Sequence, residues 1–118
     1  MLELKHKNLE VYKRSLELTT LIYKITAEFP NYELYELVSQ IRRASVSIIS
    51  NISEGSSRKS PQERKRFFEI SRSSLVELDT QIEISVKLQY ISSDYIEQLH
   101  HELNEIFAMI CSLINNTK

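Results

Sequence analysis

Residues 39–61, SQIRRASVSIISNISEGSSRKSP, combine a helical pattern, the only glycine of the chain and the start signals of another helix. Apolar side chains recur in the first part at intervals of three or four residues, the spacing of one helical face. They are Ile41, Ala44, Ile48 and Ile52. The pattern stops at Gly55, the only glycine of the chain, which is typical of the position after a helix end. Ser60, Pro61 and Glu63 then provide an N-cap, a first helical residue and a capping-box partner, so the stretch predicts two helices and a short basic loop.

The same periodicity continues toward both ends of the chain. It predicts one domain, residues 1–118, with helices over residues 7–29, 32–54, 61–90 and 94–115. One Gly and two Pro supply too few tight turns for a sheet protein of this length. Four amphipathic helices with short joins predict an all-α fold, an up-down-up-down antiparallel four-helix bundle.

Two of these helices have more apolar positions than one core face requires. For the first helix the spacing favours a seam of Leu9, Tyr12, Leu16, Thr19, Ile22, Tyr23, Thr26 and Phe29 as the core face. The additional apolar positions are Val11, Leu18, Leu21 and Ile25 in the first helix and Val38, Val46 and Ile49 in the second. A helix that is apolar over more than half its circumference is covered on two sides, and monomers rarely expose large apolar patches. We therefore expect a homo-oligomer, with a wide core contact as the alternative.

The composition, 42% apolar and 26% charged, is that of an ordinary soluble protein. Cys111 is the only cysteine and has apolar neighbours, which predicts a buried, unreactive thiol without a disulfide. No apolar segment is long enough for a signal peptide or a membrane span, so a cytoplasmic location without membrane contact is expected. Glu97 and His100 form a single E-x-x-H, half of what a di-iron bundle needs. We expect no metal, no cofactor and no enzymatic activity.

Charge is distributed unevenly although the net charge is only −1. Residues 41–72 hold eight basic and three acidic side chains, and residues 73–118 hold two basic and seven acidic ones. Such a basic segment favours an anionic partner, unless the acidic last helix lies against it and cancels the charge. The candidate nucleic-acid-binding residues are Arg42, Arg43, Arg58, Lys59, Arg64, Lys65 and Arg66.

A polar stripe follows one face of the second predicted helix on a helical wheel. Glu54 lies in its last turn, where the helix dipole disfavours an anion, so a cation should compensate it. An Arg43–Glu54 pair is the favoured arrangement, and Arg58 and Lys59 are the other candidates. The residues assigned to structure and assembly are Gln40, Arg43, Ser47, Asn51, Glu54 and Gly55.

The run QIRRASVSIISNISEG, followed by SRKSPQERKRFFEISRSSLVELDTQIEISVKL, resembles a four-helix bundle family of bacterial large-subunit ribosomal RNA intervening-sequence proteins. That family includes the accessory variability proteins of diversity-generating retroelements. The matching residues are Gln40, Arg42, Arg43, Ala44, Ser47, Ile48, Asn51, Ile52, Glu54 and Gly55, then Arg66, Phe67, Ser74, Leu75 and Glu77. Ile49, Ser53 and Ser73 depart from the usual Pro, Ala and Gly. The resemblance implies a barrel-like homopentamer with a basic surface, and in the retroelement branch a reverse transcriptase and nucleic acid as partners.

Two functions are therefore considered. The first is a non-enzymatic, homo-oligomeric bundle that binds RNA or a nucleoprotein through phosphate contacts on its basic face. The alternative is a protein-interaction scaffold with no nucleic-acid role, in which Arg43, Asn51 and Glu54 join the subunits.

Overall fold

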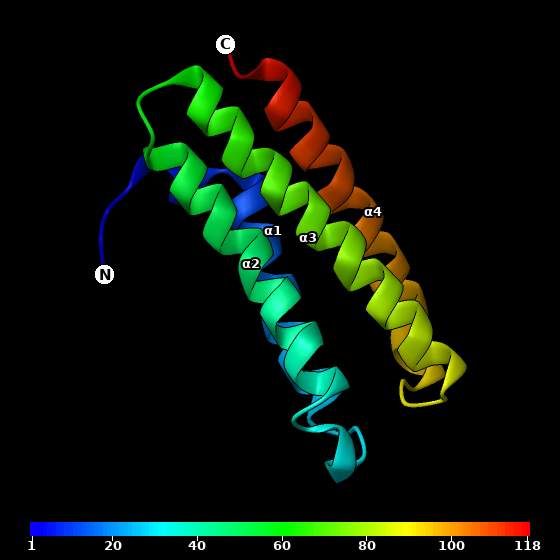
Figure 1. Ribbon diagram of the computed structural model, residues 1–118. Coiled ribbons are helices and arrows are strands. Elements are labelled where there is room, and N and C mark those ends of the chain that lie inside the picture. The colour runs from blue at the N-terminus through cyan, green and yellow to red at the C-terminus, as the bar shows by residue number, and fades with distance from the viewer.

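The structure, a computed structural model, describes residues 1–118 and contains helices only (Figure 1). The four long helices are α1 (Glu10–Thr26), α2 (Leu37–Ser57), α3 (Pro61–Lys87) and α4 (Ser93–Asn116), and two 3-10 turns are η1 (Lys5–Asn8) and η2 (Asn31–Glu33). Consecutive helices run antiparallel, and α4 returns to pack against α1. The predicted all-α, up-down-up-down four-helix bundle is confirmed.

The core contains twenty buried apolar side chains, and all four helices contribute to it. The largest of those that are almost completely buried are Leu18, Ile22, Ile41, Ile48, Ile52, Leu75, Leu78, Leu99, Ile106 and Ile110. Burial of each such side chain contributes about 1.5–3 kcal/mol relative to leaving it in water. These residues therefore account for the closed packing of the bundle.

The core face of α1 differs from the predicted one. Leu9, Leu16 and Tyr23 were placed in the core seam but are 37%, 49% and 42% exposed. The buried positions of α1 are Val11, Ser15, Leu18, Ile22, Ile25 and Thr26. Both sets have helical spacing, and spacing alone does not say which of two apolar stripes faces the bundle. The other stripe remains on the surface.

The join between α1 and α2 shortens both helices relative to the prediction. Phe29 reaches the core from a position beyond the end of α1 and is only 5% exposed. Asn31 does not cap α2; it begins η2, where the Glu33 amide donates to the Pro30 carbonyl at 2.9 Å. Residues 31–36 form η2 and the turn that follows it, so α2 begins at Leu37 and not at residue 32.

Gly55 does not end α2, contrary to the prediction. The helix continues to Ser57, and the backbone of Gly55 is not left-handed. Gly55 is buried, and a Cβ atom on it would lie 2.7 Å from Cε1 of Phe68 and 3.1 Å from the Arg64 carbonyl oxygen. The missing side chain thus allows the first turns of α3 to approach α2 closely.

Small hydroxyl residues continue this close contact along α2 and α3. The Ser71 hydroxyl donates to the Ile48 carbonyl at 2.7 Å, inside the core. The hydroxyls of Ser47 and Ser74 lie 2.7 Å apart at the edge of the same interface. Each pairing satisfies a polar atom that would otherwise be costly to bury, so the two helices can pack through serine without an apolar layer between them.

Candidate nucleic-acid interface

The join between α2 and α3 consists of residues 58–60 and is held by one arginine. The Arg64 guanidinium donates from Nη1 to the Lys59 carbonyl at 2.7 Å and to the Arg58 carbonyl at 3.3 Å. Its Nη2 lies 3.5 Å from the Lys118 carbonyl oxygen, which links the loop to the other chain end. Ser60 caps α3 as predicted, because its hydroxyl accepts from the Glu63 amide at 3.3 Å. Arg64 therefore fixes the loop backbone.

Arg58 is the cation that compensates Glu54. Its Nη2 lies 2.9 Å from Oε2 of Glu54, and its guanidinium lies 4.8 Å from the centre of the Phe67 ring. The expected Arg43–Glu54 pair is not formed, because eleven residues of α2, about 16 Å along the helix axis, separate the two. Arg58 instead follows Glu54 by one helical turn and reaches its carboxylate. Two of the predicted binding arginines, Arg58 and Arg64, thus already have partners within the chain.

Three cations beside this loop are exposed and have no ion pair: Lys59, Lys65 and Arg66. The N-terminal segment lies beside the last turns of α2 (Figure 1), and Lys7 and Ser57 line one surface hollow there. Leu4 and His6 line the same hollow, so the exposed Lys5 between them lies at that end of the bundle. We call Lys5, Lys59, Lys65 and Arg66 the cationic end. Lys5 was missed because the spacing of apolar residues says nothing about where a segment outside a helix will lie.

The remaining two predicted cations lie elsewhere on α2. Arg42 donates from Nε to the Thr26 hydroxyl at 3.0 Å, and its guanidinium lies 4.5 Å from the centre of the Tyr23 ring. Arg43 is exposed and has no ion pair. At 1.5 Å per residue these two positions lie about 20–25 Å along the helix axis from Arg58. The seven predicted cations therefore do not form one surface.

The residues assigned to assembly mostly have partners within the chain. Asn51 donates from Nδ2 to the carbonyl and hydroxyl oxygens of Ser47 at 2.8 and 3.1 Å, and Ser47 in turn meets Ser74. Gly55 packs against α3, as described above. Gln40 and Arg43 remain exposed on α2. These two are the members of the set that are open to another molecule.

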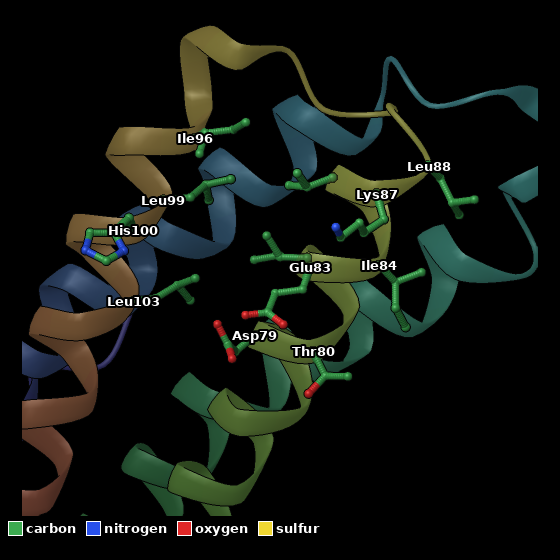
Figure 2. Close-up of a pocket in the computed structure, with 12 residues that line it drawn as sticks. Asp79, Thr80, Glu83, Ile84, Lys87, Leu88, Ile96, Leu99, His100 and Leu103 are labelled. Carbon is green, nitrogen blue, oxygen red and sulfur yellow. The ribbon is translucent and has the colours of Figure 1, made fainter.

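A groove of about 750 Å³ lies between α3 and α4, near the ends joined by residues 88–92 (Figure 2). Its lining is mainly apolar, and Ile84, Leu88 and Ile96 are 45%, 48% and 40% exposed. The carboxylates of Asp79 and Glu83 point into the space between the two helices. The groove is thus an uncovered apolar surface with acidic groups, at the opposite end of α3 from the cationic loop.

Cys111 is half-buried and not fully buried as predicted. A basic group lies near it, since Nη1 of Arg72 is 3.9 Å from its sulfur. The two residues are 39 positions apart and belong to α3 and α4, so the neighbourhood could not be inferred from local sequence. None of the helices combines the length and the hydropathy that a membrane span requires.

These features define a small helical-bundle protein with one cationic end and uncovered apolar surfaces. The chain belongs to the family of 23S rRNA-intervening sequence proteins, which matches residues 7–112. The resemblance found in the sequence is thereby confirmed. A similar solved structure is that of a protein with unknown function from the S23 ribosomal protein family of Bacteroides thetaiotaomicron. It has a TM-score of 0.78 and 24% identity, over 88% of this chain and 97% of that one. A comparison with curated proteins found no match.

Proposed function

We propose that the chain is a non-enzymatic, homo-oligomeric bundle that binds RNA or a nucleoprotein through the cationic end. The observation that carries this proposal is that Lys59 in the join and Lys65 and Arg66 in the first turns of α3 are exposed, with no carboxylate paired to them. They lie at a join whose backbone is held by Arg64. Lysine and arginine side chains supply most phosphate contacts in nucleic-acid complexes. The name of the family refers to 23S rRNA, which makes RNA the first anion to test.

Binding is expected to depend on phosphates more than on base edges. The cationic end is a loop flanked by helix ends, without an extended helix or sheet face for base contacts. Double-stranded RNA has a narrow major groove that side chains do not read, so proteins recognise it mostly by shape and backbone. The proposal therefore predicts binding that is weakly sequence-dependent and strongly salt-dependent.

The uncovered apolar surfaces support self-association. One surface lies on the outside of α1 and α2, where Leu16, Tyr23 and Val46 are 49%, 42% and 41% exposed. The other is the groove between α3 and α4, on the opposite side of the bundle. Two unlike surfaces on one chain favour a head-to-tail contact, which closes into a ring when the rotation allows it. This agrees with the homopentamer that the family resemblance implies, and a ring would repeat the cationic end in each subunit.

The test is fluorescence anisotropy of the full chain with a labelled RNA hairpin and a DNA duplex, at several salt concentrations. Lys59→Ala combined with Lys65→Ala should weaken RNA binding and reduce the slope of log affinity against log salt by about 1–2. Lys24→Ala combined with Lys87→Ala removes the same charge near the opposite end and is the matched control. If both double variants lost the same RNA affinity, the effect would be one of net charge, and the proposed binding site at the cationic end would be refuted.

The scaffold function remains the second candidate, and the uncovered apolar surfaces are the observation in its favour. It predicts that Arg43→Ala dissociates the oligomer, because Arg43 is exposed and has no partner within its own chain. Light scattering coupled to size exclusion measures this directly. An intact oligomer that binds no RNA at low salt would reject the RNA proposal, and an Arg43→Ala variant of unchanged mass would reject this role for Arg43.

A further inference from the structure

The surface hollow between the N-terminal segment and α2 has a volume of about 590 Å³ and lies beside the cationic end. It is bounded by residues 2–7, by Tyr12 and Leu16 of α1, and by one face of α2 between Ile49 and Ser57, and we call it the N-terminal hollow. Pockets that bind small ligands are of similar size, about 300–1,000 Å³. No residue of η1 is buried, so a ligand can enter the N-terminal hollow without a change of fold.

Several polar side chains around the N-terminal hollow make no hydrogen bond within the chain. They are His6, Tyr12, Ser50 and Ser53. A serine on a helix commonly donates to a carbonyl of the preceding turn, as the hydroxyls of Ser56 and Ser57 do at 2.7 and 2.8 Å. The hydroxyls of Ser50 and Ser53 are instead free to bond a ligand.

The rest of the lining is mainly apolar and aromatic. Leu16 and Ile49 supply apolar surface. The rings of His6 and Tyr12 meet edge to face, with centres 5.3 Å apart and planes at 73°, an arrangement that leaves ring faces uncovered. A ligand that matches both parts of the lining has flat apolar faces and a polar edge, as a nucleobase has. Proteins that bind single-stranded RNA stack unpaired bases on aromatic rings and hydrogen-bond the edges of those bases.

The charge at this end of the bundle favours a nucleotide over an uncharged ring. This end and the helical turns next to it contain ten lysine and arginine side chains and seven glutamates, counted over residues 1–14, 50–69 and 102–118. Two of the glutamates, Glu54 and Glu102, are paired with arginines at 2.9 and 3.1 Å. Lys7 lines the N-terminal hollow, and Lys5 and Lys59 are exposed beside it. A base in the hollow would therefore have cations next to its phosphates.

We propose that the N-terminal hollow binds an unpaired base of an RNA strand whose phosphates contact the cationic end. This inference rests on the proposed RNA function and names the kind of RNA, which is one with unpaired nucleotides. Stacking on an aromatic ring tolerates every base, so the proposal agrees with weak sequence dependence. Leu16 also belongs to the uncovered surface on α1 and α2, so the alternative occupant is a second copy of the chain.

The experiment is fluorescence anisotropy of the full chain with two labelled RNA duplexes of equal phosphate number, one with blunt ends and one with an unpaired overhang. The overhang duplex should bind more tightly. Tyr12→Ala should weaken overhang binding by roughly fivefold or more, the lower end of what one stacked base contributes, and leave blunt-end binding unchanged. Tyr12→Phe should retain most of the overhang affinity. Tyr12 lies outside the core, so these substitutions leave the fold intact, and Ser53→Leu, which fills the hollow, should also weaken overhang binding alone.

Tyr35→Ala is the matched control, because Tyr35 is 88% exposed in the join of α1 and α2 at the opposite end of the bundle, and it should leave both affinities unchanged (Figure 1). Equal affinity of the wild type for the two duplexes, or an overhang affinity that Tyr12→Ala and Ser53→Leu leave unchanged, would overturn the proposal. A lower oligomer mass of Tyr12→Ala in light scattering would also overturn it, because the occupant would then be a second copy.

Lys59→Ala combined with Lys65→Ala separates this inference from the proposed function. The double variant should weaken binding of both duplexes, because it removes phosphate contacts. If it does so while the wild type shows no preference for the overhang, the cationic end stands and the N-terminal hollow is rejected. If it leaves both affinities unchanged while Tyr12→Ala weakens overhang binding, the cationic end is rejected and base binding in the hollow stands. If neither duplex binds at low salt, both proposals are rejected.

Discussion

Replacing Gly55 by alanine tests the close packing of α2 against α3. The new Cβ would lie 2.7 Å and 2.9 Å from two ring carbons of Phe68 and 3.1 Å from the Arg64 carbonyl oxygen. Carbon atoms pack at about 3.5–4.0 Å, so the ring would have to move by most of an ångström. Phe68 is only 3% exposed and cannot turn away into solvent.

The expected magnitude is the difference between two effects. Overpacking of this kind costs about 1–3 kcal/mol, and alanine in a helix regains about 0.5–1 kcal/mol over glycine. Gly55→Ala should therefore lower the free energy of unfolding by about 1–2 kcal/mol. Urea denaturation followed by circular dichroism measures it, at several protein concentrations so that self-association is taken into account.

The decisive comparison is made in a Phe68→Val background. Valine lacks both ring carbons that the new Cβ would meet, and only the contact with the Arg64 carbonyl oxygen at 3.1 Å remains. The cost of Gly55→Ala should therefore be clearly smaller there than with phenylalanine at position 68, by about 1 kcal/mol. If Gly55 were a left-handed helix end, as the sequence suggested, alanine would destabilise the protein in both backgrounds. A loss of the same size with Phe68→Val would refute the packing argument.

Three further predictions concern single interactions. Arg14 of α1 and Glu102 of α4 form an ion pair at 3.1 Å, in which each side chain is 19% exposed, and the bond to Glu102 raises the pKa of Arg14. Glu102→Gln should lower the free energy of unfolding, measured by urea denaturation, by about 1 kcal/mol. In an Arg14→Met background the same substitution should have no further effect. Arg64→Lys keeps the charge but loses the guanidinium, whose Nη1 bonds the Arg58 and Lys59 carbonyls while Nη2 reaches the Lys118 carbonyl. Exchange of the Arg58 amide, which donates to the Gly55 carbonyl at 3.2 Å, should therefore accelerate while the α2 and α3 amides stay protected. Folding raises the pKa of Tyr90 through the hydrogen bonds of its hydroxyl with Tyr32 and Glu33, so the contribution of this residue to stability is complete below the ordinary tyrosine pKa of about 10 and is lost as the pH rises above it. The urea concentration at the midpoint of unfolding should therefore fall less between pH 8 and pH 11 in the Tyr90→Phe variant than in the wild type.

The sequence predicted the helices best where capping chemistry is local. Ser60 and Pro61 mark the start of α3 at the residue where the structure begins it, because the cap needs only neighbours in the chain. The join around Asn31 was predicted poorly, since Phe29 is fixed by the core and Glu33 by Tyr90, 57 positions away. The prediction that Gly55 ends α2 was wrong for the same reason, because the role of this glycine depends on Phe68 in another helix.

The candidate site was predicted in part. Grouping Arg58, Lys59, Arg64, Lys65 and Arg66 at one join follows from their adjacency in sequence, and the structure places them there. Which of them are free could not be predicted, because the partners of Arg64 are backbone carbonyls whose direction is set by the loop. A helical wheel gives the angle around the axis and not the height along it. Arg42 and Arg43 were therefore grouped with cations that lie several turns away.

The short join between α2 and α3 has a consequence for the order in which the chain folds. Only residues 58–60 separate these helices, so bringing them together costs little loop-closure entropy. The Arg14–Glu102 contact instead closes a loop of 88 positions and is formed at far greater entropic cost. The α2–α3 hairpin is thus the natural folding nucleus, and docking of α1 onto α4 is the late step. Substitutions in the hairpin would then act mainly on the folding rate, and substitutions between α1 and α4 mainly on the unfolding rate.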